Sequence, residues 1–571
     1  MKTVRNATIA VLGATMIAGA AGAAEILVSG NITTSTTWTK NNVYNLQGQV
    51  YVMPGATLTI QAGTVIASNS GGSLAITRDA RLVCNGTETE PVIFTSKNDY
   101  NTWTNGDPKT GTWRAVANEW GNVTICGRGY ISKYGQGAVT TNTAAPSAGN
   151  YANMEGLVAS SLTDTRTFYG GGDDNDNSGT FRFVSLRYGG QVVGLGNELN
   201  GLSLGGIGRG TTIDHIEIMN NVDDGIEIWG GTVDLKYFSI WNIGDDSLDV
   251  DQGWRGRAQF GLIVQGYSIP GAAAGSGFPD CAIEMDGAEK SDAQPVSTAN
   301  FWNMTVIGQP LSGKHGTKWH DNMRAQFHAS IFMDLGARLI QNDNTDGEAT
   351  GGQTGYGFNG TLTWANTWTT AYNVYPTVNP FANPAQAYQA QKSGTLIEFT
   401  DCVFFNNLNA AAYTEATARG VFAAANGNVT AAAGSSPIQQ IVRGANVVSG
   451  TTVVQPVIGL DPRANNAAAT ATTSAPADGW FVPVTYRGAF GPNENWLCGW
   501  TAADAFGYVI KPAGVCVSSC VADLDRNQVV NGADLGIVLG AWGTGSGDLN
   551  GDGTTNGADL GIVLGSWGPC Q

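Results

Sequence analysis

The sequence predicts an all-β protein, a right-handed single-stranded parallel β-helix, followed by a small α-helical module. The first observation is a repeat: D-D-G-I-E-I at residues 223–228 recurs 22 residues later as D-D-S-L-D-V at residues 245–250, and Asn220 recurs as Asn242. The second is that short alternating, β-branched stretches are separated by Gly, Asn and Asp turns. A period of this length is typical of solenoids, and the strand composition favours β over helical repeats.

Stacked coils have a chemical consequence on their outer face. If Ile226 and Ile228 point into the core, the alternation of a strand turns their neighbours outward. Equivalent positions on adjacent rungs lie about 4.8 Å apart, so like charges there need cations or must stay protonated. We therefore expect the outward carboxylates to form the main functional site of the protein. The alternative is that they are only a solvated row of acidic turns. The five carboxylates are Asp223, Glu227, Asp245, Asp249 and Asp251.

The N-terminus has the pattern of a secretory signal peptide over residues 1–24. Lys2 and Arg5 precede an apolar run from residue 7 to about residue 21, and small residues fill 20–24. No later segment is long and apolar enough to predict a membrane span. We therefore expect a secreted protein that is extracellular or held at the cell surface.

The charge balance is strongly acidic. The formal charge is −17, and removal of Lys2 and Arg5 with the leader makes it −19. This excess argues against nucleic acid and anionic membranes as partners and suits Ca²⁺ or neutral and basic ligands. Only 13% of residues are charged and 79 are Gly, which fits a turn-rich β solenoid.

Cysteine usage points to disulfides, since an even number in an exported chain favours them. Pairing stays open, although Cys570 bonded to Cys516 or Cys520 would clasp the C-terminal module. No cysteine lies in a nucleophile motif, and none is assigned to catalysis. The eight are Cys84, Cys126, Cys281, Cys402, Cys498, Cys516, Cys520 and Cys570.

Further coils are predicted along the chain, with residues 26–96 as an N-terminal cap and the first coils. Residues 463–477 are low in complexity and are expected to form a mobile loop. Strands are expected at 57–60, 73–76, 91–96, 120–125, 181–186, 302–307, 329–332 and 397–404, and insertions at 266–280, 341–393 and 407–440.

Two lesser candidates carry polar ligands. Residues 173–177 (D-D-N-D-N) offer oxygen ligands for Ca²⁺, although a polar loop between coils is the favoured interpretation. His315 and His320 flank Trp319 as a metal or substrate pair, but ordinary packed or surface histidines are favoured.

The C-terminus carries a duplicated loop–helix motif. Residues 548–559 place oxygen ligands at positions 1, 3 and 5, Gly at 6, a backbone carbonyl at 7 and Asp rather than Glu at 12. A second copy at 523–534 has Gln528 in place of the turn glycine, which predicts a weaker site. Each copy precedes A-D-L-G-I-V-L, which predicts two amphipathic helices, and each ends near a Trp-Gly pair.

This region resembles a type I dockerin of the bacterial N-G-A-D-L-G kind over residues 517–571. The resemblance implies two Ca²⁺ sites and a docking role toward a cell-surface or scaffold protein. Loop positions 10 and 11 hold Gly-Ala instead of the usual hydroxyl residues, which argues against a true cohesin partner. The implied ligands are Asp523, Asp525, Asn527, Asn531, Asp534, Asp548, Asn550, Asp552, Asn556 and Asp559, with backbone oxygens from Val529 and Thr554.

The preceding region resembles an exported bacterial family of pectin-lyase-like β-helix proteins over residues 26–510. The resemblance rests on the stretches at 173–190, 200–214, 223–233 and 244–256 and on the closing stretches at 486–490 and 496–501. It implies fold and export, not a chemistry. The predicted domains are therefore a signal peptide (1–24), a β-helix (25–510) and a dockerin-like module (511–571).

The sequence is compatible with three functions. The favoured one is a non-enzymatic, anchored solenoid that binds carbohydrate or extracellular matrix. Trp229, Trp241 and Trp254 would stack on sugars, although tryptophans also close coils.

The second is a polysaccharide hydrolase resembling polygalacturonases, with Asp223, Asp245 and Asp246 as acid and base. The Gly-His-Gly and Arg-Ile-Lys motifs of those enzymes are missing from the expected coil. The third is a Ca²⁺-dependent lyase with Arg255 or Arg257 as the base, which rests on fold analogy alone.

Overall fold

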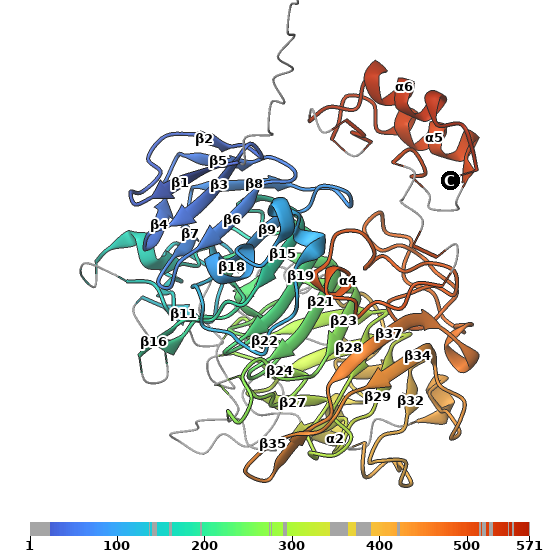
Figure 1. The fold of residues 1–571 in the computed structure, drawn as a ribbon. Coiled ribbons are helices and arrows are strands. Elements are labelled where there is room, and N and C mark those ends of the chain that lie inside the picture. The colour runs from blue at the N-terminus through green and yellow to red at the C-terminus, as the bar shows by residue number, and fades with distance from the viewer. Residues whose placement is uncertain are drawn as a thin grey trace, which may run out of the picture.

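The structure is a computed structural model in which 27 of the 39 strands of the described residues belong to stacked parallel coils (Figure 1). The predicted signal peptide lies outside the described residues up to residue 22. The structure describes residues 23–135, 138–139, 146–158, 161, 163–194, 197–272, 275, 277–288, 294–342, 364–372, 390–418, 423–512, 515–516, 521–524, 529–545, 547–550 and 553–569.

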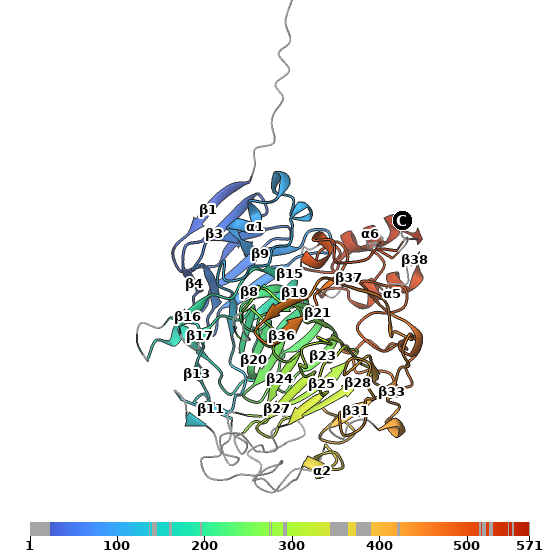
Figure 2. The ribbon, with the colours of Figure 1, turned by 60° about the horizontal axis from the view of Figure 1, so that its bottom comes forward.

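One wall of the solenoid is a nine-stranded sheet in which each coil contributes one strand. All eight neighbouring pairs are parallel. Figure 2 shows β20, β24 and β27 following one another along the solenoid. In spatial order the strands are β4 (Gln49–Val52), β7 (Ser73–Ile76), β10 (Val123–Cys126), β18 (Leu202–Ile207), β20 (Ile226–Gly231), β22 (Leu248–Asp251), β24 (Ile283–Asp286), β27 (Thr317–His320) and β30 (Ile340–Asn342).

The other wall is an 18-stranded sheet that bends along its length. Four long strands, β15 (Gly179–Arg187), β19 (Thr212–Asn221), β21 (Asp234–Ile243) and β23 (Arg257–Val264), run through the bend. On either side of them the neighbouring coils have two short strands in place of one long strand. These are β1 (Ala24–Val28), β2 (Thr36–Trp38), β3 (Asn42–Leu46), β5 (Thr57–Ile60), β6 (Val65–Ser68), β8 (Arg81–Asn85), β9 (Val92–Ser96), β25 (Thr298–Trp302), β26 (Thr305–Ile307), β28 (Arg324–His328), β29 (Ile331–Met333), β31 (Glu398–Thr400), β32 (Val403–Phe405) and β33 (Val429–Thr430).

Smaller elements decorate the coils. Antiparallel pairs are β11 (Lys133–Tyr134) with β12 (Ala138–Val139), β13 (Ala152–Asn153) with β14 (Phe168–Tyr169), β16 (Val192–Gly194) with β17 (Asn197–Glu198), β34 (Ile438–Arg443) with β37 (Val457–Ala464), β35 (Val447–Ser449) with β36 (Thr452–Val454), and β38 (Val529–Val530) with β39 (Gly568–Pro569). Helical turns are α1 (Lys97–Tyr100), α2 (Trp364–Thr367), α4 (Ala502–Ala505), η1 (Thr104–Gly106), η2 (Pro108–Thr110), η3 (Thr165–Thr167), η5 (Ala424–Asn426) and η6 (Asn466–Ala468).

The repeat predicted from the sequence is the register of the coils. Ile226 pairs with Leu248, and Ile216 pairs with Phe238, each 22 residues apart. These inward side chains are fully buried in one continuous apolar core. The predicted parallel β-helix is therefore confirmed as long parallel sheets around a shared core, while its right hand stays a prediction.

An aromatic ladder forms at the bend of the long strands. Phe183, His215, Tyr237 and Phe260 each have a left-handed backbone, with φ between 46° and 58°. Successive ring centroids lie 4.1, 4.5 and 4.8 Å apart, and all three pairs are stacked. Because a left-handed conformation is costly for non-glycine residues, stacking along the ladder offsets strain at each bend. His215 is thus a packed side chain.

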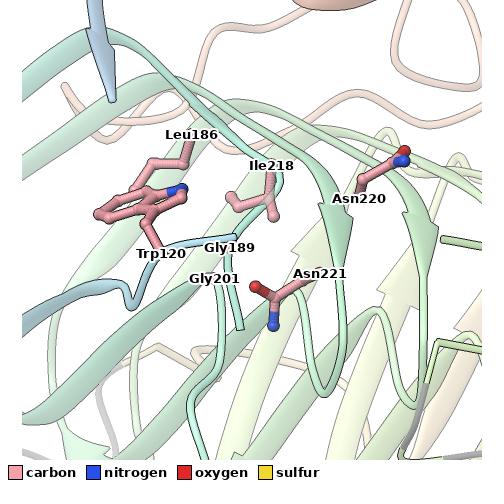
Figure 3. Close-up of a pocket in the computed structure, with 7 residues that line it drawn as sticks. All are labelled: Trp120, Leu186, Gly189, Gly201, Ile218, Asn220 and Asn221. Atoms are coloured by element: carbon pink, nitrogen blue, oxygen red, sulfur yellow. The ribbon is translucent and has the colours of Figure 1, made fainter. Parts of the chain in front are cut away.

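Close packing also fills the turn between the two walls near Trp120. Figure 3 shows Trp120, Leu186, Ile218, Gly189 and Gly201, which line one hollow. The hollow that these residues line has about 0 Å³ of room for water. It is therefore a tightly packed corner and no ligand site.

Residues 438–510 cover the long strands as a strap. Trp500 and Leu497 pack in one buried cluster with Trp241 of β21. The buried carboxylate of Glu217 accepts hydrogen bonds from the backbone amides of Ala502 and Ala503 at the start of α4. This contact joins the strap to β19, so the strap is a structural part of the solenoid.

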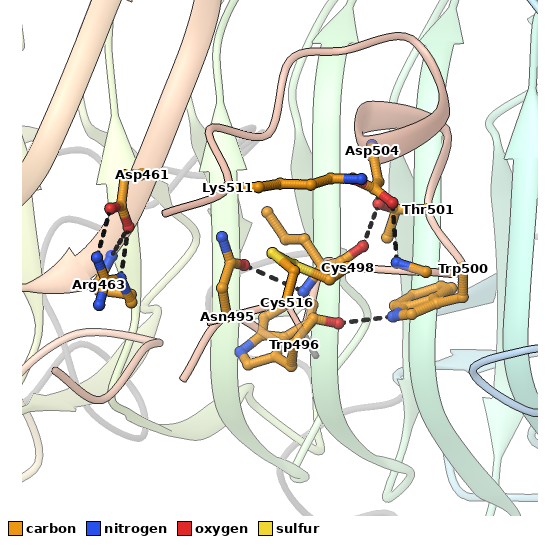
Figure 4. Close-up of a disulfide and its surroundings, with 12 residues drawn as sticks. Asp461, Arg463, Asn495, Trp496, Cys498, Trp500, Thr501, Asp504, Lys511 and Cys516 are labelled. Carbon is orange, nitrogen blue, oxygen red and sulfur yellow. Dashed lines mark hydrogen bonds and ion pairs between the residues drawn. A yellow bond between two sulfur atoms is a disulfide. The ribbon is translucent and has the colours of Figure 1, made fainter. Parts of the chain in front are cut away.

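A disulfide between Cys498 and Cys516 fastens the strap, beside the ion pair of Asp504 and Lys511 (Figure 4). It corrects the proposed bond between Cys516 and Cys570; the alternative bond from Cys520 to Cys570 lies outside the described residues. Four further cysteines are free and buried, contrary to a general disulfide framework: Cys84, Cys126, Cys281 and Cys402.

The low-complexity segment 463–477 is packed, which corrects the expected mobile loop. The side chain of Asp401 accepts hydrogen bonds from the amides of Thr472 and Thr473, at 2.6 and 2.8 Å. Ala468 and Ala475 are buried. Its small residues therefore serve close packing rather than flexibility.

The two helices predicted at the C-terminus are confirmed as α5 (Gly532–Gly540) and α6 (Gly557–Gly565). Each begins with the same capping box, formed by Asn531 and Asp534 in α5 and by Asn556 and Asp559 in α6. Val538 and Val563 share a small buried cluster. No helix in the described part of the chain is both long enough and apolar enough to cross a membrane.

The first prediction concerns His328, which ends β28 and stacks on Trp302 with ring centroids 4.3 Å apart. Burial lowers the pKa of His328 from 6.5 to about 4, although Glu398 and Asp401 oppose the shift. Because folding lowers the pKa of His328, the unfolding free energy has its full value above pH 6.5 and decreases as the pH falls toward about 4. The full effect is about 3 kcal/mol.

His328→Phe keeps a stacking ring but removes the titration. Denaturant unfolding across this pH window should therefore show a smaller loss of unfolding free energy in the variant than in the wild type. Equal losses in both proteins would contradict the assignment.

Candidate functional site

The outward positions of the nine-stranded sheet carry the main concentration of charge. The inward residues of β20, β22 and β24 are fully buried, so alternation points their neighbours outward. Five of the carboxylates belong to these strands and five to the turns that precede them. We call this set the acidic face: Asp223, Asp224, Glu227, Asp245, Asp246, Asp249, Asp251, Asp280, Glu284 and Asp286.

Strand register places the acidic side chains in a row. Glu227 pairs with Asp249, Asp249 with Glu284, and Glu284 with Lys318. In the next outward row Asp286 pairs with His320. The predicted adjacency of Glu227 and Asp249 on successive rungs is therefore what the structure shows.

The structure extends the face by one coil beyond the sequence analysis. Asp280, Glu284 and Asp286 were missed because the insertion at 266–280 stretches the repeat between Leu248 and its partner Ile283 to 35 residues. A signal was present, since D-C-A-I-E-M-D at 280–286 has the same alternation as D-D-S-L-D-V-D.

Ligand atoms converge at four places. In each group, one atom from every member lies within 4.8 Å of the others. Two groups join β20 to β22 and two involve β24. They are Asp223, Asp224 and Asp245; Asp224, Glu227 and Asp249; Asp246, Asp280 and Cys281; and Glu284, Asp286 and His320.

Few groups neutralise this face. Lys318 Nζ lies 2.6 Å from Glu284 Oε1, and Lys314 Nζ lies 2.6 Å from Asp280 Oδ1. His320 Nε2 approaches Glu284 Oε1 at 3.3 Å. All three contacts are at the β24 end of the face.

Neutral partners and backbone amides fix the β20 end instead. The side-chain Nδ2 of Asn200 donates a hydrogen bond to Glu227. The side-chain Oδ1 of Asn200 accepts one from the backbone amide of Asp224 at 3.2 Å. The amide of Asp246 donates to Asp224 Oδ1 at 3.0 Å. These bonds orient the carboxylates before any cation binds.

Burial and crowding set the acid strengths. Burial, reinforced by neighbouring carboxylates, raises the pKa of Asp224, Glu227 and Asp249 well above the usual range, and that of Asp245 to about 7. Burial acts the same way on Glu284, but hydrogen bonds from His320, Asp246 and Lys318 outweigh it and lower its pKa. Asp224, Glu227, Asp245 and Asp249 therefore take up a proton more readily than ordinary carboxylates, because their charged forms are buried and crowded.

The three catalytic candidates are not arranged as an inverting pair. The nearest oxygens of Asp223 and Asp245 lie within 4.8 Å. Inverting glycosidases separate their carboxyl groups by about 6.5–9.5 Å to admit water. Asp246, the residue after Asp245, is grouped with Asp280 and Cys281 instead.

The tryptophans suggested as sugar platforms are core residues. Trp229, Trp241 and Trp254 are all buried. The indole nitrogen of Trp254 donates to the carbonyl of Val233 at 2.9 Å. These side chains close coils, which corrects the proposal that they stack on sugars.

The arginines suggested as a lyase base are held in ion pairs. Arg255 is buried and pairs with Asp174 at 2.6 Å, and Arg257 pairs with Asp234 and Asp478. Neither is available as a base, which corrects that assignment. Asp174 is thereby used structurally, so the loop at 173–177 fits the favoured polar-loop interpretation.

The two histidines suggested as metal or substrate ligands have different roles. His315 Nδ1 accepts from the backbone amide of Arg338 at 3.2 Å, whereas His320 joins Glu284 and Asp286. His315 thus has the ordinary role that the sequence favours. His320 lies on the acidic face.

The C-terminal loops show part of their expected ligand sets. Asp534 and Asp559 are buried and accept hydrogen bonds from backbone amides of their loops, from Leu524 at 2.7 Å and from Leu549 at 2.7 Å. Burial opposes ionisation of Asp559, but the amides of Asn556, Leu549 and Asn550 outweigh it and lower its pKa. Three further implied ligands lie outside the described residues: Asp525, Asn527 and Asp552.

These loops fit Ca²⁺ by their donor chemistry. Asp523 and Asp548 hold position 1 of the two loops, Asn550 holds position 3 of the second, and Asn531 and Asn556 follow the predicted carbonyls of Val529 and Thr554. Asp548 Oδ2 also accepts from the amide of Gly553 at 2.6 Å, which closes the second loop. Oxygen-only sets of this kind suit a hard cation.

Comparison with known proteins identifies the solenoid alone. A family model described as a pectate-lyase-like β-helix domain matches residues 30–398. Neither a curated protein nor a solved structure matches the chain. The match covers the whole nine-stranded sheet and stops at β31.

The second prediction tests crowding on the acidic face. Asp249→Asn removes one charge from a group of three carboxylates while it keeps the side-chain shape. In chelator at neutral pH this variant should gain about 1 kcal/mol of unfolding free energy, because one pKa unit of relieved repulsion has that value. Urea unfolding measures the change.

A matched control is Asp234→Asn, which breaks the ion pair with Arg257. Because Asp234 is in an ion pair, the same replacement of Asp by Asn at this position should lower the unfolding free energy. Destabilisation of the Asp249→Asn protein in chelator would mean that the carboxylates do not repel one another.

Proposed function

This chain belongs to the pectate-lyase-like β-helix family, and on that premise we propose that it is a secreted, non-catalytic solenoid that binds Ca²⁺ on its acidic face. Through the bound cations it holds a polysaccharide of the extracellular matrix. A C-terminal dockerin-like module attaches it to a cell-surface or scaffold protein.

One observation carries the proposal: among the described residues, ten carboxylates crowd one face, and the ion pairs of two lysines and one histidine reach it. Ca²⁺ takes six to eight oxygens at about 2.3–2.6 Å, so two oxygens on one ion lie at most about 5 Å apart. Asp224, Glu227 and Asp249 meet that limit, with one oxygen of each within 4.8 Å of the others. A cation there relieves the repulsion that raises their pKa values.

The same charge decides how a polysaccharide would bind. With Trp229, Trp241 and Trp254 buried, the sugar has no indole of this set to stack on. An acidic polysaccharide is repelled by the bare face but is bridged to it by Ca²⁺. We therefore expect an anionic polysaccharide, bound only when the face carries cations.

Attachment through the C-terminus is supported by a repeated apolar surface. Leu539 near the end of α5 and Trp542 just after it are about half exposed, at 52% and 49%, and Leu564 and Trp567 match them at the end of α6, at 55% and 51%. Exposed apolar side chains repeated in this way mark an interaction surface. The predicted signal peptide supports the same extracellular setting.

A hydrolase stays as the second candidate because of Asp245. Its pKa of about 7 suits a group that gives and takes a proton near neutral pH. Asp223 lies beside it, and Asp246 follows it in the same turn. The short distance from Asp223 to Asp245 is the argument against a water-activating pair.

The third prediction tests cation-dependent binding with the full chain. Ca²⁺ at about 100 times its Kd should raise the unfolding free energy by about 2.7 kcal/mol. In the double variant Glu227→Gln, Asp249→Asn this gain should shrink. Retention on an insoluble polyuronate should vanish with chelator and in the same variant, while Asp548→Asn in the C-terminal loop should keep it.

Release of reducing ends from a polysaccharide panel decides between the two candidates. None is expected. Reducing ends that appear with the wild type and vanish in Asp245→Asn would overturn the non-catalytic proposal in favour of the hydrolase.

The fourth prediction tests attachment. Leu539→Lys with Leu564→Lys places two charges on the exposed C-terminal surface and should abolish Ca²⁺-dependent retention on the producing cells. Polyuronate binding should be unchanged. Wild-type retention of the variant on cells would contradict a docking role for this surface.

A further inference from the structure

We infer that Asp246, Asp280 and Cys281 form a second site, for a thiophilic divalent transition metal of the Zn²⁺ class. It joins the coils of β22 and β24, whereas the group of Asp224, Glu227 and Asp249 joins those of β20 and β22; the two groups share no residue, and this site does not depend on the function proposed above. One ligand atom from each of its three residues lies within 4.8 Å of the other two.

Strand register builds this group. Leu248 pairs with Ile283, so the turns that precede β22 and β24 lie side by side. The amide of Asp280 donates to the carbonyl of Asp245 at 3.0 Å, which fixes the two turns to each other. Asp246 and Cys281, each two residues before the paired residues, are therefore held level on adjacent coils.

Burial supplies an independent observation. Asp246 is 4% exposed, and its Oδ1 has no hydrogen-bond partner. An unsatisfied carboxylate oxygen in the interior is costly unless a cation or proton meets it. Cys281, only 1% exposed and free, brings its sulfur to the same place.

The three ligands suit a transition metal with one open position. Two carboxylates and one thiolate equal the number of protein ligands in Zn²⁺ sites whose fourth place is taken by water. Lys314, which contacts Asp280 through Oδ1, leaves the other oxygen of that carboxylate for the metal.

The sulfur sets the choice of metal. Ca²⁺ and Mg²⁺ take oxygen ligands, whereas thiolate favours Zn²⁺ and related ions. Among the described residues, the groups able to hold a metal include Cys281 but none of the other free cysteines, Cys84, Cys126 and Cys402. The buried cysteine at this position therefore distinguishes the site from the all-oxygen groups beside it.

Cobalt absorption tests the inference in the full chain. The protein is first treated with chelator and exchanged into buffer that contains no reducing agent. Co²⁺ should then produce a near-ultraviolet thiolate-to-cobalt charge-transfer band that saturates at one ion per chain for this site. Zn²⁺ should remove the band and excess Ca²⁺ should not. Cys281→Ser should abolish it, while the matched buried variant Cys402→Ser should keep it.

Asp246→Asn provides a second test if Cys281→Ser does not fold, and should weaken Co²⁺ binding at least about tenfold. Asp249→Asn, in the neighbouring all-oxygen group, should leave the band intact. Absence of the band in the folded wild type, or an equal band with equal affinity in Cys281→Ser or Asp246→Asn, would overturn the proposal.

Discussion

In-register stacking of parallel rungs, about 4.8 Å apart, is the constraint on which the rest of this molecule depends. A position repeated on successive coils becomes a ladder, whatever its chemistry. Inside, Ile226 and Leu248 stack into a continuous core. At the bend, Phe183 and His215 stack their rings although their backbones are left-handed. Outside, the same spacing forces Glu227 onto Asp249.

The apolar ladders and the acidic ladder have opposite energetics. Core stacking stabilises the coil by burying apolar surface, whereas the stacked carboxylates repel and are partly desolvated. The molecule tolerates the second because the first, and the strap joined to β19 through Glu217, hold the coils in place. A cation on the acidic face converts its main source of strain into a binding site, and this is the basis of the proposed function.

The repeat of 22 residues was enough to predict the parallel coils and the Glu227–Asp249 adjacency, because both follow from period and alternation alone. Asp280, Glu284 and Asp286 escaped because an insertion breaks the period before β24. The burial of Trp241 and the Cys498–Cys516 bond depend on a strap far away in sequence, which no local pattern encodes. Packing likewise overrode composition at 463–477.

The most direct measurement is a crystal structure of the full chain grown with Ca²⁺, read by anomalous scattering at the acidic face. The account predicts a peak bound by oxygens of Asp224, Glu227 and Asp249 at about 2.3–2.6 Å. Well-ordered carboxylates that hydrogen-bond directly to one another, with no anomalous peak among them at saturating Ca²⁺, would contradict it.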